Sequence, residues 1–303
     1  MRTAFIGALL RLAERDSRIW LLCGDLGYSV LEPFASRFSD RFVNVGVAEQ
    51  NLPRVSAGLA LCDKIVFTYS IANFPVMRCL EQIRNDVCYH GLNVKIVAVG
   101  GGLAYGAQGY THHGVEDLAV TRVLPNMSVL APGDPVEAAL ATTALASWQG
   151  PCYLRLGKEG EPIVHDVAPA FAIGKAITMR VGGALTLIST GGTLELTMSA
   201  SAMLAATGLS VRVLSMPTLR PLDREAVVCA ARETGKIITV EEHGVGGLGS
   251  AVAEVLAELD VPVRFRPVRL QATPSTVAGS QKTLLLAHGI SAQSVSQIAL
   301  ALL

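Results

Sequence analysis

The stretch from residue 42 to residue 61, FVNVGVAEQNLPRVSAGLAL, most narrowly limits how this chain can fold. It predicts a short apolar strand, a glycine turn, and then a helix of small and apolar residues. Pro53 lacks an N–H and fits a helix only in the first turn, which places the helix start near residues 48–50. Glu49 then lies in the turn among apolar neighbours, so we expect its carboxyl group to be partly buried. On spacing alone, the favoured interpretation is that this acid serves only to favour the helix start.

Apolar strands alternate with helical segments along the rest of the chain. This alternation predicts an α/β protein with two doubly wound, mostly parallel sheets. A length of 303 residues suits two domains. Periodicity is lost where glycine, proline and charged residues gather, so we expect a first domain over 1–160, a linker over 161–175 and a second domain over 176–303. Within the first domain, Asp134, Pro135 and Glu137 form a capping-box start of a helix.

Charge and composition exclude several classes of function. Lysine plus arginine and aspartate plus glutamate number 25 each, and no basic stripe points to nucleic acid or an anionic membrane. No uninterrupted apolar run of 18 or more residues indicates a transmembrane helix, and the N-terminus is typical of an amphipathic helix rather than a signal peptide. The six cysteines lack metal-site or C-x-x-C spacing. We therefore expect a soluble cytoplasmic protein.

Polar residues follow several of the predicted strands. Asp25 and Ser29 come after the apolar segment RIWLLC, at the sheet edge where ligands bind in parallel α/β folds, although Asp25 could only cap a turn. The later loop LAYGAQGYTHHGVEDLA holds the adjacent His112 and His113 among glycines, as a substrate-facing loop would. A metal site is disfavoured there because adjacent histidines rarely point at one ion.

A glycine motif in the second half, GVGGLG at residues 244–249, follows a strand and precedes a helix, as in dinucleotide-binding folds. The strand, however, ends in Glu241 and Glu242, which place negative charge where a pyrophosphate would lie. The next strand presents arginines rather than an acid for the ribose. Dinucleotide binding is therefore disfavoured for this motif.

Three segments together resemble the transketolase family of thiamine diphosphate enzymes. NVGVAEQN is similar to the N-x-G-I-A-E-Q signature of its pyrimidine-binding domain, GYTHHGVEDLA to its D-G-x-T-H-Q-x-x-E-D-L-A loop, and VEEHGVGGLGSAV to a segment of its C-terminal domain. The family also includes deoxyxylulose-phosphate synthases and the β subunits of 2-oxoacid dehydrogenases. The resemblance implies that Glu49 contacts N1′ of the aminopyrimidine and so promotes loss of the proton from the thiazolium C2 carbon.

The resemblance also assigns roles to other residues. Phe74 would stack on the aminopyrimidine, with Ile71 where another phenylalanine is common, and His112 would face the reacting carbonyl. Arg155 stands where a phosphate-binding arginine is expected, although a surface ion pair is equally open. The implied catalytic residues are Glu49 and His112; the cofactor-binding residues are Glu49, Phe74, Ile71 and Asp25; the substrate-binding residues are His112, His113, Gln108, Ser29 and Arg155.

Two departures from the family pattern leave the donor substrate open. Gln108 occupies the position of an aspartate that recognises a sugar hydroxyl, and Gly100 that of a histidine near the donor. Neither change concerns the activation of thiamine diphosphate.

The resemblance covers a pyrimidine-binding and a C-terminal domain but no diphosphate-binding domain, whose G-D-G motif and asparagine hold Mg²⁺. We therefore expect the C-terminal subunit of a split transketolase-like enzyme, with Mg²⁺ ligands on an N-terminal partner subunit in an α2β2 heterotetramer. It would transfer a two-carbon ketol or acyl unit from a ketose or 2-oxoacid to an aldehyde. The alternatives are a subunit that acts on pyruvate, like deoxyxylulose-phosphate synthase or a dehydrogenase β subunit, and a catalytically silent scaffold.

Overall fold

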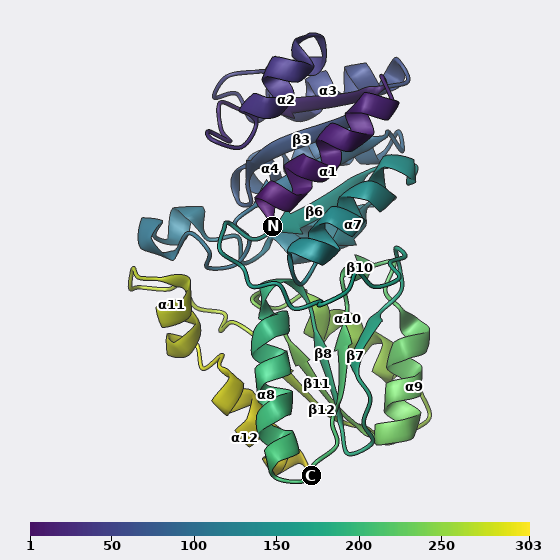
Figure 1. Cartoon of the computed structure of the whole chain (residues 1–303), viewed down its shortest axis with the longest axis vertical. Helices are drawn as coiled ribbons and strands as arrows, with labels where there is room; N and C mark the ends of the chain where they lie inside the picture. The colour runs from purple at the N-terminus through teal and green to yellow at the C-terminus, as the bar shows by residue number, and fades with distance from the viewer.

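The computed structural model describes all residues from 1 to 303, which form two α/β domains, one above the other (Figure 1). The first is built on a seven-stranded sheet and the second on a five-stranded sheet. Every neighbouring pair of strands runs parallel, except for one antiparallel strand at an edge of each sheet. This arrangement confirms the predicted fold class.

The first sheet has the strand order β10-β5-β6-β4-β3-β1-β2. Its strands are β1 (Ile19–Cys23), β2 (Phe42–Asn44), β3 (Ile65–Ile71), β4 (Val94–Val99), β5 (Ser128–Leu130), β6 (Cys152–Leu156) and β10 (Thr218–Arg220). The central strands β3 and β4 are mostly apolar and almost entirely buried, as expected of strands covered on both faces.

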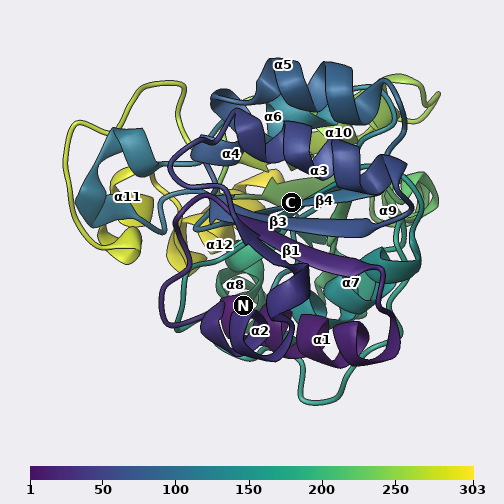
Figure 2. The same cartoon turned by 90° about the horizontal axis from the view of Figure 1, so that it is seen from above.

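Helices cover both faces of this sheet (Figure 2). One face carries α1 (Arg2–Arg15), α2 (Glu32–Arg37) and α7 (Pro135–Ser147); the other carries α3 (Asn51–Leu61), α4 (Phe74–Met77), α5 (Leu80–Gln82) and α6 (Asp117–Arg122). In α1 the buried residues Phe5, Ile6, Leu9 and Ala13 recur at helical spacing and form one apolar stripe.

The turn before α3 follows the prediction from the sequence. The helix begins at Asn51, so Pro53 lies in its first turn, where it removes no helical hydrogen bond. Glu49 lies in the turn between β2 and α3 and is buried. This short connection places the carboxyl group of Glu49 at the carboxyl-terminal edge of the sheet.

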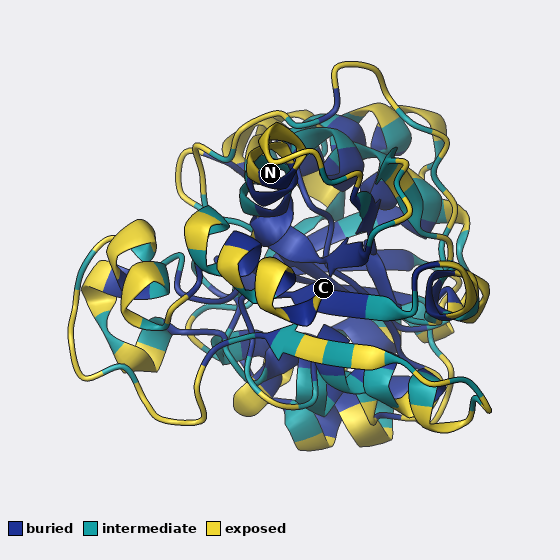
Figure 3. Ribbon diagram, turned by 90° about the horizontal axis from the view of Figure 1, so that it is seen from below, coloured by how far each residue is buried: buried dark blue, intermediate teal, exposed yellow.

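The second sheet has the strand order β12-β11-β8-β9-β7. Its strands are β7 (Ile177–Arg180), β8 (Thr186–Ser189), β9 (Arg212–Ser215), β11 (Lys236–Val240) and β12 (Arg264–Val268); its helices are α8 (Leu194–Ala206), α9 (Arg224–Thr234), α10 (Leu248–Ala257), α11 (Gln281–Ala287) and α12 (Ala292–Leu302). The inner strands β8, β9 and β11 form the buried centre of the domain (Figure 3). The short helix α11 projects at the side of the domain (Figure 1).

The two domains are joined by more than a linker. Residues 157–176 form no helix or strand, as the loss of periodicity predicts. The strand β10, which comes from the second half of the chain, pairs antiparallel with β5 and completes the first sheet. The chain therefore crosses between the domains more than once.

The C-terminal stretch Gln281–Leu302 has a mean hydropathy of 1.3, and by length and composition alone it is apolar enough for a membrane span. It folds as two helices of 7 and 11 residues, each far shorter than the roughly 20 residues needed to cross a bilayer. The Ser291 side chain caps the second helix, which buries Val295 and Ala299 in the domain. These are surface helices of the second domain.

Candidate active site

The residues predicted for the site come from loops at one edge of the first sheet. Asp25 and Ser29 follow β1, Glu49 follows β2, Ile71 ends β3, and the histidine loop follows β4. Because parallel strands bring their carboxyl ends to the same edge, the topology gathers these loops where ligands bind in such sheets.

Glu49, Phe74 and His112 are brought together through one additional residue, Arg78. Its Nη1 lies 2.8 Å from Oε1 of Glu49, and its Cζ lies 4.6 Å from the centre of the Phe74 ring. The Phe74 ring in turn meets the His112 imidazole edge-on, with centroids 5.2 Å apart. The three residues with the strongest predicted roles therefore form one contiguous cluster.

Contacts to its backbone fix Glu49 in place. The Cys79 thiol donates to the Glu49 carbonyl oxygen over 2.9 Å, and burial raises the pKa of this thiol to about 12, which keeps the proton in place. The N–H of Leu52 donates to the same carbonyl oxygen. Glu49 itself is 8 % exposed, so only a small part of it is open to a ligand.

This cluster fits the aminopyrimidine of thiamine diphosphate. A largely buried carboxyl group can hydrogen-bond a ring nitrogen away from water, and the half-buried Phe74 ring can stack on a flat heteroaromatic ring. For the metal, no group of three or more His, Cys, Asp or Glu side chains in the chain is arranged so that it could hold an ion. The location of the Mg²⁺ ligands on a partner subunit stays a prediction.

Asp25 and Ser29 belong to a tight loop after β1. Both have left-handed backbones, with φ of 57° and 64°. The Asp25 carboxylate accepts from Asn44 Nδ2 at 3.0 Å and from the Tyr28 hydroxyl at 3.2 Å. Asp25 thus holds its own loop against β2, as the turn alternative proposed, while remaining partly exposed at the site edge. The Ser29 side chain is exposed, and Ile71 is half-buried. Their contacts with cofactor or substrate stay predictions.

The histidine loop separates its two histidines. His112 stays half-exposed beside Phe74, whereas His113 is 1 % exposed and packs against Tyr110. Burial lowers the pKa of His113, and its Nε2 has no protein partner. His113 lines a separate cavity of about 310 Å³, whose far wall is formed by residues 270–275 of the second domain. A direct contact with substrate is therefore better supported for His112 and for the exposed Gln108 than for His113.

Gly100 has a structural role that its departure from the family pattern did not indicate. Its φ is +75°, and a Cβ built there would lie 2.1 Å from Cε2 of Tyr105. The Tyr105 ring therefore fills the space beside residue 100. A histidine at this position, as the family pattern has it, does not fit this loop.

Arg155 lies in the interface between the domains. It is 5 % exposed; its Nη2 donates to the carbonyl oxygens of Gly114 at 2.6 Å and Glu242 at 2.9 Å, and its Nε lies 3.1 Å from Oδ2 of Asp117. The alternative of a surface ion pair is wrong, because both charged groups are buried. The predicted phosphate contact is untested, but this guanidinium is already engaged by groups of the chain itself.

The structure also disfavours a dinucleotide at the glycine motif of residues 244–249, as predicted. The Glu241 carboxylate accepts from the N–H groups of Leu248 and Gly249, both at 2.7 Å, at the start of α10. It therefore occupies the helix N-terminus that a pyrophosphate would need. Burial raises the pKa of Glu241 to about 7.

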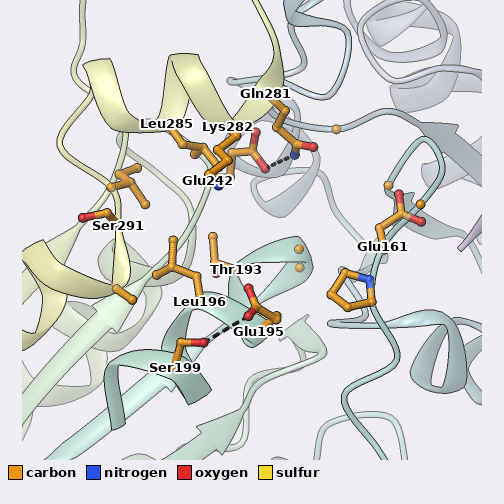
Figure 4. A pocket seen from close by; sticks show the side chains of 18 of the residues that line it. Glu161, Thr193, Glu195, Leu196, Ser199, Glu242, Gln281, Lys282, Leu285 and Ser291 are labelled. Carbon is orange, nitrogen blue, oxygen red and sulfur yellow. Dashed lines mark hydrogen bonds between the residues drawn. The ribbon is translucent and has the colours of Figure 1, made fainter. Parts of the chain in front are cut away.

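A cavity of about 850 Å³ lies away from the Glu49 cluster, between the domains (Figure 4). Its wall is formed by the start of α8, by α11 and by the linker, and Glu242 lies in it, held by Gln281 Nε2 at 2.8 Å. Of the predicted site residues, only Arg155 borders it. Its size therefore does not identify it as the catalytic site.

Arg78 is the site residue that the sequence reasoning missed. It follows Phe74 by four residues, and in a helical segment this spacing places two side chains on the same face. That periodicity was the available signal for an arginine beside the stacking ring.

Comparison with known proteins identifies the same two domains. Residues 1–161 match the family model described as "Transketolase, pyrimidine binding domain", and residues 174–295 match "Transketolase, C-terminal domain".

Similar curated proteins include one of the subunits of the apulose-4-phosphate transketolase of Phocaeicola vulgatus, which is 39% identical over 99% of this chain and 96% of its own length. A 6-deoxy-6-sulfo-D-fructose transketolase subunit of a Clostridium species is 37% identical over 88% of this chain and 84% of its own length. In contrast, the 1-deoxy-D-xylulose-5-phosphate synthase of Syntrophotalea carbinolica, at 34% identity over 96% of this chain, is matched over only 46% of its length.

A solved structure described as a split gene transketolase, inactive beta4 tetramer, superposes with a TM-score of 0.89 at 38% identity, covering 99% of this chain and 96% of the other. The motifs, the fold and these similarities over almost the full length agree: the chain belongs to the transketolase family.

Proposed function

We propose that this chain is the C-terminal subunit of a split, thiamine diphosphate-dependent transketolase, which transfers a two-carbon ketol unit from a ketose to an aldehyde. The single observation that carries the proposal is the cluster of Glu49, Phe74 and His112 at one sheet edge. Subunits of split transketolases match the chain over nearly its whole length, which supports the same conclusion.

When bound, thiamine diphosphate supplies a nucleophilic carbon that attacks the donor carbonyl. The side chains at this edge of the sheet would bind and orient the cofactor and the donor. The Glu49 carboxyl group would share a proton with the aminopyrimidine nitrogen, and the Phe74 ring would stack on one face of the aminopyrimidine and so fix its orientation. His112, half-exposed next to Phe74, would donate a hydrogen bond to the oxygen of the reacting carbonyl as negative charge develops there.

The partner in this proposal is an N-terminal subunit that carries the diphosphate-binding domain and the Mg²⁺ ligands, in an α2β2 heterotetramer. The relative from Phocaeicola vulgatus is itself named as one subunit of its enzyme, which supports an enzyme made of two kinds of chain. Several large apolar side chains are exposed on the first domain, among them Val47, Leu61 and Tyr89, and they suit a contact surface between chains.

We propose a ketose with an anionic group as the donor. Two relatives are named for a phosphorylated and a sulfonated sugar, and both names therefore specify an anionic group. Pyruvate-type chemistry is less supported, since the synthase relatives are matched over only half their length. A silent scaffold is disfavoured by the intact cluster around Glu49.

The test is calorimetric titration of thiamine diphosphate with Mg²⁺ into the chain alone and into its complex with the co-expressed diphosphate-domain protein. We expect saturable binding only by the complex, weakened at least tenfold by Glu49→Gln, because the buried carboxyl loses its charged hydrogen bond to the ring. Glu81→Gln, at an exposed position on α5, is the matched control and should bind as the wild type does. Tight binding by the chain alone, or none by the complex, would contradict the proposal.

A further inference from the structure

Arg78 contacts both groups that the proposed cofactor would need. Its guanidinium pairs with the Glu49 carboxylate at 2.8 Å and lies over the Phe74 ring, with Cζ 4.6 Å from the ring centre. The Arg78 side chain is 53 % exposed and so reaches these two groups from the solvent side. The Cys79 thiol contacts the backbone carbonyl oxygens of the same two residues, whereas Arg78 contacts the carboxylate and the ring themselves.

These contacts give Arg78 a clear physical role. A nearly buried carboxylate without a cationic partner is costly, and the guanidinium supplies that partner. The planar guanidinium also suits the face of an aromatic ring better than an ammonium group does. Arg78 therefore pairs with the Glu49 carboxylate and covers the Phe74 ring.

The same contacts oppose cofactor binding. The guanidinium already donates to Oε1 of Glu49, so that oxygen is not free to form a hydrogen bond with a ring nitrogen. The guanidinium also takes up space on the ring that a stacked heterocycle would use. The Arg78 guanidinium and the aminopyrimidine of the cofactor would therefore compete for the Glu49 carboxylate and for the face of the Phe74 ring.

We propose that Arg78 is a displaceable latch on the cofactor site, meaning a side chain that occupies the site until the cofactor binds; this inference rests on the proposed function. The aminopyrimidine replaces the guanidinium on Glu49 and Phe74, and the half-exposed Arg78 side chain rotates toward solvent. The backbone need not move, because Arg78 lies at the end of the four-residue helix α4 and only its side chain reaches the site. In this scheme Arg78 is a positioning residue that sets cofactor affinity and takes no part in the reaction.

The experiment compares cofactor dissociation constants of the assembled complex by calorimetry, without substrate. Arg78→Met keeps most of the length of the side chain but removes the charge, and we expect binding about three- to tenfold tighter, since half-exposed ion pairs and cation–π contacts are individually weak. Arg84→Met is the matched control, because Arg84 is exposed and its only side-chain hydrogen bond is to its neighbour Asn85. It removes the same charge without touching Glu49.

A second pair of variants checks the mechanism. In a Glu49→Gln background the effect of Arg78→Met should shrink, because the ion pair is already absent; Arg78→Lys, which keeps the charge, should bind more weakly than Arg78→Met. If Arg78→Met binds as the wild type does, or more weakly relative to Arg84→Met, the latch is refuted while the proposed function stands. If the wild-type complex binds no thiamine diphosphate, both proposals fail.

Discussion

At the scale of single residues, Gly100 offers the sharpest test of how tightly the histidine loop is packed. Its φ is +75°, and an added Cβ would lie 2.1 Å from the Tyr105 ring. Gly100→Ala should therefore cost roughly 2–4 kcal/mol of unfolding free energy, from the left-handed backbone together with the overlap. The measurement is the midpoint of urea unfolding.

Gly160→Ala separates the two causes of that loss. Gly160 has nearly the same φ, +74°, but no atom lies within 4 Å of its added Cβ. This variant should lose only about 1 kcal/mol, the cost of the backbone conformation. Equal losses for both glycines would mean that the Tyr105 ring simply moves aside. In that case Gly100 would not explain the missing histidine of the family pattern.

The resemblance to the transketolase family singled out Glu49, Phe74 and His112, and each follows a strand or turn that the sequence marks clearly. It could not locate their partners. Arg155 and His113 sit at the predicted points of the chain, yet their side chains face the second domain. Such contacts join residues more than 80 positions apart, and local patterns carry no information on them.

At the scale of elements, the start of α7 fastens the linker to the first domain. Asp134 caps the helix as predicted, through the N–H of Glu137 at 2.8 Å, but Glu137 reaches back to the N–H of Gly133 rather than to that of Asp134. The linker adds the rest: Asp134 also accepts from the N–H of His165, and Glu137 Oε1 lies 2.8 Å from His165 Nε2. The capping residues were predictable; their second use was not.

This arrangement predicts a pH dependence of stability. The hydrogen bond to Glu137 raises the pKa of His165 above its usual value near 6.5, so the folded state binds this proton more tightly than the unfolded state. The stabilisation is complete below about pH 6.5 and is lost as pH rises through the raised pKa. The difference in unfolding free energy between wild type and His165→Gln should therefore be largest near pH 5.5 and shrink toward pH 8.5.

The matched control for this titration is His90→Gln, since His90 is exposed on the first domain. Its difference from the wild type should not follow the pattern of His165→Gln. A wild-type advantage over His165→Gln that stays constant across the range would show that the contact with Glu137 does not depend on protonation.

At the scale of the whole molecule, the two domains share a buried polar interface. The alternation of strands and helices in the sequence predicts the two domains but not the contacts between them. Asp117 is buried, accepts from the Tyr153 hydroxyl at 2.5 Å, and lies 3.7 Å from Nε2 of His243 in the second domain. Glu242 accepts from the N–H of Leu103, at the start of the loop that carries His112. The second domain thus holds the start of the histidine loop in place through this hydrogen bond.

Arg155 is the centre of this interface, and its removal should uncouple the domains. Arg155→Met would leave Asp117 without its cation and the carbonyl oxygens of Gly114 and Glu242 without a donor, which should cost roughly 3–5 kcal/mol. Urea unfolding followed by both fluorescence and circular dichroism should show a lower midpoint and two separate transitions.

Glu254→Gln is the control, because it also breaks an ion pair between the domains, with Arg122 at 2.6 Å, but Glu254 is 62 % exposed. That change should cost less than about 1 kcal/mol, as exposed pairs do. If Arg155→Met instead unfolds like the wild type and the complex loses affinity for an anionic donor, then the guanidinium serves the substrate, as the family resemblance implies. Because the two outcomes differ in stability and in binding, this one variant decides whether Arg155 holds the domains or the substrate.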